Sequence, residues 1–419
     1  MLMPMKTIAG LFPALVCSAS LTVHAQEPAP VAPAPAPAPV VEPAPAPAPA
    51  PLPAPEAAAP PEVVAEPVPV AVEPPPEEPA AVPVPSPISV NAWMHLSFRL
   101  QGAEERDSFD NLIIDVGELD LLFNADITDN IGITADLVGD ISGGGSVGIL
   151  DLIGRFKIHD AFNIWVGRML VPSDRSNFSG FWFANPWYYP GFFIPGAAPF
   201  GPQQGPFGRN DGATVWGQFG GGLFKYYLSI FELTEPADPL LFSGRLNLSL
   251  LSPEPGYYHS STYLGEKDIL AIGIAAQYEK DGAAPDDYSM FNADLLFEKT
   301  FGEGGMVSFQ GAFYLPMGDG NTLDSQFFVE ASYLTGKPVG FGKIQPLVRL
   351  QVANPKSDVY ESWTIVEGQL GYVISGYAAR LALGYQYSDT PPGVDLETSA
   401  PLAMNVAGHA IYLGIQLQK

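Results

Sequence analysis

Two pairs of opposite charges bracket an unusual stretch of this 419-residue chain. Asp174 and Arg175 precede it, and Arg209 and Asp211 lie at its other end. Residues 178–207 include eleven aromatic side chains, broken repeatedly by Gly and Pro. Opposite charges that face a narrow aqueous passage create a field that selects solutes by charge. We therefore predict that these four residues set the charge of a constriction.

Other kinds of chemistry have weak support in the sequence. Asp319, Asn321 and Asp324 lie in a GDGNTLD loop that could contact Ca²⁺, but their spacing falls short of a calcium-binding loop. GGGSVG at 143–148 matches G-x-G-x-x-G only formally, because it leads into a strand rather than a helix. The histidines show no metal-ligand spacing. We expect no cofactor, no metal and no enzyme activity, although Ser, His and Asp brought together only by folding stay open.

The elements that must position these charges follow a two-residue period. From Val90 to Gln101 apolar residues alternate with polar or small ones, which is the periodicity of a strand. Strands of soluble proteins usually have about five or six residues, whereas tilted membrane-spanning strands need about nine to eleven. Most runs in this chain are as long as the second kind or longer. Sixteen are predicted, near 90–101, 111–125, 131–141, 147–158, 162–171, 212–220, 222–232, 243–252, 267–279, 289–300, 304–315, 325–335, 342–352, 361–374, 376–388 and 408–418.

The connections between these runs favour a closed membrane barrel. Tight turns, such as FGEGG after 289–300 and SG after 361–374, alternate with longer polar loops. Outer-membrane barrels show this alternation, with the short turns in the periplasm. Residues 252–266 are long for such a turn, and Pro346 would forfeit a ladder hydrogen bond. We predict an all-β fold, a transmembrane antiparallel β-barrel of about sixteen strands; a soluble sandwich or solenoid would have shorter strands.

Alternation also assigns charged side chains to the lumen, because charges are costly on the lipid face. The basic residues predicted to face the lumen are Arg99, Arg155, Lys157, Lys225, Arg245, Arg349 and Arg380. The acidic ones are Asp120, Asp136, Asp140, Asp151, Asp294, Glu298, Glu330 and Glu367.

The aromatic stretch belongs to the longest connection, residues 172–211. Its Gly and Pro residues predict neither helix nor strand, yet so many rings are rarely left in water. A sixteen-stranded barrel is wide enough to admit a loop. We favour a loop folded inward as a constriction; the alternative is an external loop that packs over the rim or contacts a neighbouring subunit.

The N-terminal part of the chain is predicted to lie outside the fold. Residues 1–25 have the basic start, the apolar run and the small-residue exit of a signal peptide. Cys17, the only cysteine, lies within it, so the mature protein would have no disulfide. Residues 26–88 are mostly Pro, Ala, Val and Glu and cannot bury enough apolar surface to fold. We predict a disordered periplasmic linker, either an inert spacer or a tether that touches the cell wall.

Two segments resemble a known family. WVGRMLVPSDRSNFSG at 165–180 and GRLNLSLLSPEPGYYHSSTYLGEKDILAIGIAAQY at 244–278 are similar to porins of the phosphate-selective porin O and P type and to related proteobacterial porins. The resemblance covers about 89–419. It implies sixteen strands, a trimer, and a third loop that enters the lumen. Those porins carry a ladder of Lys and Arg and end on an aromatic residue, whereas this chain is acidic and ends at Lys419. Phosphate selectivity is therefore not carried over.

These features predict a multi-pass porin of the Gram-negative outer membrane, with residues 89–419 forming the barrel. The expected partners are outer-membrane lipid, further copies of the chain in a homotrimer, and small hydrophilic solutes or ions that pass by diffusion; peptidoglycan, through the linker, stays open. A net charge of −26 argues against nucleic acid. Two alternatives remain: a structural envelope anchor with a plugged barrel and a Pro/Ala arm on the cell wall, and a surface adhesin that uses the aromatic loop externally.

Overall fold

The computed structural model describes residues 88–102, 111–115, 118–140, 146–188, 208–232, 239–280, 287–318, 323–356, 362–389 and 408–419. The predicted signal peptide and all but the last residue of the predicted linker lie outside the described residues. So do Asp319 and Asn321 of the candidate calcium loop and residues 189–207 of the aromatic loop.

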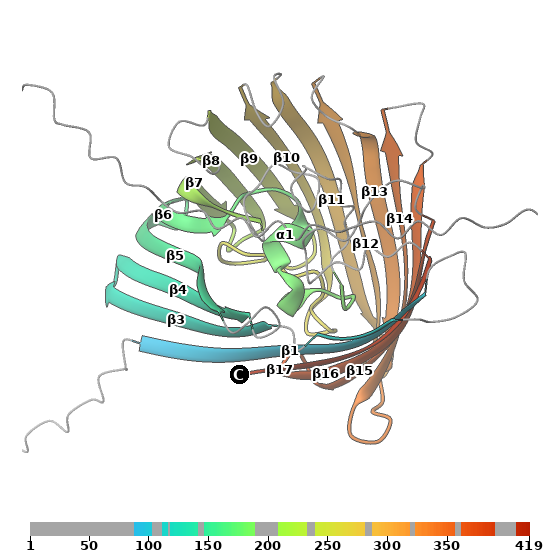
Figure 1. Cartoon of the computed structure of the whole chain (residues 1–419). Helices are drawn as coiled ribbons and strands as arrows, with labels where there is room; N and C mark the ends of the chain where they lie inside the picture. The colour runs from blue at the N-terminus through green and yellow to red at the C-terminus, as the bar shows by residue number, and fades with distance from the viewer. Residues whose placement is uncertain are drawn as a thin grey trace, which may run out of the picture. The chain divides into compact units, whose positions relative to one another are not determined.

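The described residues of the folded part form a closed antiparallel barrel of sixteen strands, one of which consists of two segments (Figure 1). β1 (Ile88–Gly102) closes the ring by pairing with β17 (Gly408–Gln418). β2 (Asn111–Asp115) and β3 (Glu118–Thr128) both pair with β1, so these two segments together count as one strand of the barrel. The other strands are β4 (Ile131–Asp140), β5 (Ser146–His159), β6 (Phe162–Leu170), β7 (Arg209–Phe219), β8 (Phe224–Glu232), β9 (Leu240–Ser249), β10 (Ile269–Glu279), β11 (Tyr288–Phe301), β12 (Gly305–Met317), β13 (Leu323–Leu334), β14 (Lys343–Pro355), β15 (Trp363–Ser375) and β16 (Ala379–Asp389).

The last residue of the chain completes the closure. The amide of Ala92 donates to the carbonyl of Lys419 at 2.8 Å, and the amide of Lys419 donates back to Ala92 at 3.0 Å. Closure gives each edge strand a hydrogen-bonding partner. A sheet within a bilayer needs this, because lipid cannot pair with its backbone N–H and C=O groups.

Alternation along the strands separates the two faces of the barrel, as the sequence predicted. In β9, Arg245, Asn247 and Ser249 are buried, whereas Leu246 and Leu248 on the opposite face are exposed. Because successive side chains point to opposite faces, the polar set must face the interior and the apolar set the surroundings. The predicted fold class is therefore confirmed, and each of the sixteen predicted runs overlaps one strand of the barrel.

The short turns are also confirmed. Between β11 and β12 the chain reverses in three residues, where Gly302 and Gly304 adopt φ values of 49° and 90°. Residues other than glycine rarely adopt these φ angles, which explains the glycines of the FGEGG turn. Among the described helical segments, none is long and apolar enough to cross a membrane.

Two connections fold into the barrel instead of leaving it. The first joins β6 to β7 and contains α1 (Arg175–Ser179) and the short 3-10 helix η1 (Phe181–Phe183). Figure 1 shows α1 surrounded by the ring of strands. We call its described inner part, residues 172–188, the inner loop. The second connection, residues 250–268 between β9 and β10, is called the insert.

Candidate channel constriction

The inner loop begins with a short helix that the sequence did not predict. Asp174 caps α1, because its carboxylate accepts a hydrogen bond from the amide of Ser176 at 3.0 Å. The helix ends at Gly180, which has a φ of 59°. The expectation of neither helix nor strand was wrong here, because an Asp cap and a following Gly are enough for one turn. β7 begins at Arg209, so the connection also ends three residues earlier than the predicted 172–211.

Hydrogen bonds tie the inner loop to inward-facing residues around most of the barrel. The indole of Trp182 donates to Asp120 on β3 at 2.7 Å. At the other end, the amide of Trp187 donates to Gln369 on β15 at 2.7 Å. Asn185 donates to Ser332 on β13, and from the wall Arg349 of β14 and Arg380 of β16 donate to the carbonyls of Tyr188 and Ala184. These contacts place residues 172–188 inside the barrel.

The ring of Trp187 packs against the barrel wall at Gly414, where the wall has no side chain. Its ring stacks on His95 with a centroid distance of 3.8 Å. A Cβ at Gly414 would lie 2.2 Å from Cε2 of Trp187. Real Cβ atoms do not approach so closely, so only glycine at this position of β17 admits the ring.

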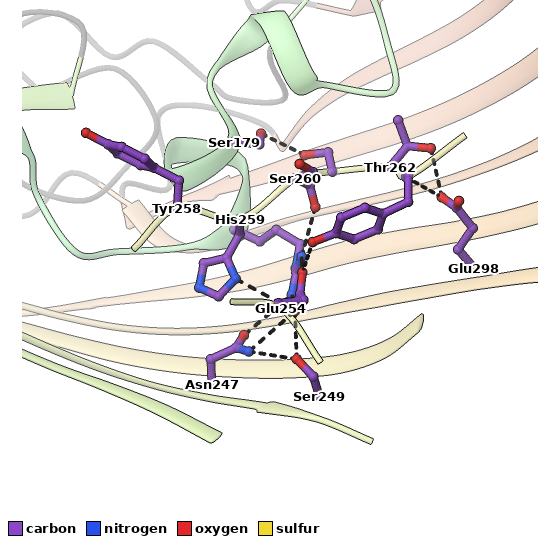
Figure 2. A network of polar contacts seen from close by, with 12 residues as sticks. Ser179, Asn247, Ser249, Glu254, Tyr258, His259, Ser260, Thr262 and Glu298 are labelled. Atoms are coloured by element: carbon purple, nitrogen blue, oxygen red, sulfur yellow. Dashed lines mark hydrogen bonds and ion pairs between the residues drawn. The ribbon is translucent and has the colours of Figure 1, made fainter. Parts of the chain in front are cut away.

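The insert is held against the inner loop by Glu254 (Figure 2). Arg175 donates to both carboxylate oxygens of Glu254, at 2.7 and 2.8 Å. Ser249 donates to the same carboxylate at 2.7 Å, and Tyr263 at 2.5 Å. The side chains of Arg175 and Glu254 are 0% and 1% exposed. A bidentate pair of this kind is among the stronger hydrogen-bonded contacts, and its burial makes it costly to break on one side only.

A second carboxylate completes the charge balance on the barrel wall. Arg245 of β9 donates to Asp294 of β11 at 2.5 and 3.0 Å, and the backbone amide of Arg175 donates to Asp294 at 3.2 Å. Gly273 lies between these strands, and a Cβ there would lie 2.2 Å from the Arg245 guanidinium. Two guanidinium groups thus share two carboxylates in a region closed to solvent.

The insert has anchors of its own along the wall. The carboxylate of Glu298 accepts from the amides of Tyr263 and Gly265 at 2.9 and 2.8 Å, and from the hydroxyl of Thr262 at 2.8 Å. Lys225 donates to the carbonyls of Gly256 and Tyr258 at 3.0 and 3.2 Å. The unusual length of this turn-side connection is therefore explained by a segment that packs inside.

Burial and neighbouring charges fix the ionisation of the network. Burial alone would lower the pKa of Arg175, but Glu254 outweighs it and the pKa is raised. Burial opposes the charge of Glu254 as well, yet Arg175 holds the pKa of this carboxyl well below its usual range. Burial, reinforced by Lys225, lowers the pKa of His259 well below its ordinary value, so the ring is neutral at neutral pH.

The inner loop and the insert leave a cavity of about 610 Å³ against the wall formed by β3 to β6. Its aromatic lining comes from Trp93, Trp165, Phe178, Trp182, Phe183, Tyr258 and Tyr263. Its charged lining comes from Asp136, Asp151, Arg155, Arg209, Glu254 and Lys267. Figure 2 shows the ring of Tyr258 turned away from Glu254. The cavity is large enough for a compact solute.

The four residues predicted to set the constriction charge lie in three environments. Asp174 and Arg175 have no exposed surface and are used to cap α1 and to hold the insert. Arg209 lines the cavity and pairs with Asp151 at 3.2 Å. Asp211 pairs with Arg168 at 2.8 Å on the strand face that carries the exposed Phe219. Of the four, Arg209 therefore remains the candidate constriction charge.

The basic residues predicted to face the lumen, together with Asp136, lie on the strand face that carries the buried polar side chains. Asp136, Lys225, Arg245, Arg349 and Arg380 are buried; Arg99 and Arg155 are half-buried, and Lys157 is exposed. Several of them hold the inner loop or the insert, which alternation alone does not reveal. Within the described ranges, no group of three or more His, Cys, Asp or Glu side chains is arranged to hold a metal ion.

Comparison with known proteins supports the fold. No protein-family model matches the chain, and no curated protein matches its sequence. The structure of Pseudomonas putida OprB at high pH aligns with a TM-score of 0.52 at 11% identity, over 79% of this chain and 93% of that chain. The trimer form of in-vitro folded OmpT, an outer membrane protein of Vibrio cholerae, aligns with a TM-score of 0.51 at 12% identity, over 80% of this chain and 100% of that chain. At such low identities the similarity establishes the barrel fold alone.

Proposed function

We propose that the protein is an outer-membrane porin that passes small hydrophilic solutes and ions by diffusion. The observation that carries this proposal is a closed barrel whose lumen is narrowed by two segments around a charged, aromatic cavity. A closed sheet with an apolar outer face suits a membrane, and a polar interior suits water.

The mechanism is permeation without a chemical step. Arg209 and Asp151 would set the field in the cavity, because both line it. Asp174 and Arg175 would act indirectly, by fixing where the inner loop lies. The similarity to a barrel known in a trimer form supports a trimer for this chain as part of the proposal.

The test is the conductance of residues 26–419, folded in detergent and added to planar lipid bilayers in KCl. A porin gives stepwise openings of uniform size, and grouping in threes indicates a trimer. A folded, heat-modifiable barrel that gives no openings would contradict the proposal.

One observation favours a second candidate, an envelope anchor with a plugged barrel. The inner loop and the insert are held by buried ion pairs, so the lumen is heavily occupied. An anchor would be silent in bilayers, and deletion of residues 27–87 would produce envelope defects while leaving the barrel folded.

A further inference from the structure

One carboxylate in the cavity lacks the partner that its surroundings require. Asp136 on β4 is 3% exposed and lines the cavity. Its Oδ1 has no hydrogen-bond partner among the described residues. A buried acceptor without a partner is costly, and more so when it is charged, so the site is arranged for a donor that the described residues do not supply.

The neighbouring charges make that donor a cation. Asp120 on β3 and Asp151 on β5 project from the same inner face, and Asp136 lies directly opposite Asp151 in the register. Arg209 pairs with Asp151, and the indole of Trp182 donates to Asp120. Three carboxylates with one guanidinium leave an excess of negative charge on this wall. A cationic group relieves this repulsion, whereas a neutral hydroxyl does not.

The other cations near the cavity are already engaged. Arg155 donates to Asp126 at 3.2 Å and to the carbonyl of Ile133 at 3.3 Å. Lys267 lies 3.9 Å from the centre of the Tyr263 ring and donates to the carbonyl of Pro253. Arg175 is held by Glu254. None of these groups bonds to Asp136.

The walls beside Asp136 suit the body of such a solute. Trp93, Trp165 and Trp182 line the same cavity with Phe183 and Tyr258. Aromatic faces attract cations and cover apolar groups, which a hydrated inorganic ion does not exploit. The volume of about 610 Å³ fits a molecule of one or two rings.

We propose that this cavity is a binding site for compact organic cations, with Asp136 receiving an ammonium group and the aromatic walls covering the body of the molecule. This inference rests on the proposed porin function and names the class of solute that the channel retains in passage.

The test compares benzylammonium chloride with benzyl alcohol, a neutral molecule of similar shape, as blockers of the bilayer current. Benzylammonium is expected to block at concentrations at least about tenfold lower than benzyl alcohol, the factor that one charged hydrogen bond supplies. Asp136→Asn should raise the half-blocking concentration of benzylammonium about tenfold and leave that of benzyl alcohol unchanged. Asp211→Asn, on the outer strand face, is the matched control and should change neither.

Three results would overturn the inference. Equal block by the two probes, or equal block of the wild type and Asp136→Asn, would remove the role of the carboxylate. Glucose blocking better than benzylammonium would assign the cavity to neutral polyhydroxylated rings. Equilibrium dialysis of benzylammonium against the folded protein in detergent gives the same comparison without conduction. A silent barrel that still binds the probe through Asp136 would contradict the porin and retain the binding site.

Discussion

Glu254→Gln separates the role of charge from the role of shape at the contact between the inner loop and the insert. The substitution keeps the size of the side chain but leaves the buried Arg175 guanidinium without its bidentate carboxylate. Removing one partner of a buried ion pair costs about 3–5 kcal/mol. Arg175 retains Asp294 at 3.8 Å and the carbonyl of Ser260 at 2.8 Å, so we expect the lower end, about 3 kcal/mol.

A loss of about 3 kcal/mol raises the population of the opened insert about a hundredfold. The assay is the rate of limited proteolysis within the insert and the inner loop of the folded barrel, together with open-channel noise in bilayers. Because Arg175 holds the pKa of Glu254 well below its ordinary 4.5, the stability from this pair is fully present above about pH 4.5. It is lost progressively as the pH falls from there to the lowered pKa, where the pair itself breaks.

The matched control is Glu266→Gln, which removes an exposed carboxylate from the same insert. It should cleave and conduct like the wild type. Equal cleavage rates of Glu254→Gln and Glu266→Gln would show that the buried pair does not hold the two segments together.

Three further outcomes are expected. Gly414→Ala should displace Trp187 and lower the free energy of unfolding by about 1–3 kcal/mol, measured as a lower denaturant midpoint. Because His259 is buried and neutral, the closed insert should be most stable above the ordinary histidine pKa of 6.5. Its free energy of opening should fall by up to about 1.4 kcal/mol per pH unit as the pH decreases below 6.5. His259→Gln should abolish this pH dependence of the proteolysis rate. Arg209→Gln should raise the cation-to-anion permeability ratio about twofold to fivefold in a KCl gradient, the factor expected for a partly exposed ion pair, whereas Asp211→Asn should not.

Each of these outcomes has a result that would count against it. Gly368, where a Cβ would meet nothing within 4 Å, is the control for Gly414, and equal effects of Ala at both positions would argue against the docking of Trp187. A pH slope that survives in His259→Gln would assign it to another group. An unchanged reversal potential in Arg209→Gln would remove Arg209 from the permeation path.

The strands were predictable from sequence because their signal is local. The alternation of Arg245, Leu246, Asn247, Leu248 and Ser249 defines both a strand and its two faces without knowledge of the neighbouring strands. The inward course of the aromatic loop was favoured for a similar reason, since its composition is incompatible with exposure to water.

The use of the charges was not predictable, because it depends on contacts between distant segments. Arg175 and Glu254 are 79 positions apart, and the sequence around either residue does not indicate that the two will pair. The only signal of the insert was a connection too long for a periplasmic turn. Asp211 was assigned to the constriction because the predicted strand began at 212; in the structure it lies within β7, on the face that carries the exposed Phe219, and pairs with Arg168.

A cross-link between the inner loop and the insert tests most directly whether both segments stay inside a conducting barrel. The hydroxyls of Ser179 and Ser261 lie 2.8 Å apart, and both residues are buried. The predicted mature chain has no cysteine of its own, so Ser179→Cys combined with Ser261→Cys gives one defined pair. The measurement is the unit conductance of the oxidised double variant before and after reduction. We expect near-complete cross-linking and stepwise openings of the same size in both states. Free thiols in the folded barrel, or a conductance that rises on reduction, would contradict the claim that these two segments are already joined in the open channel.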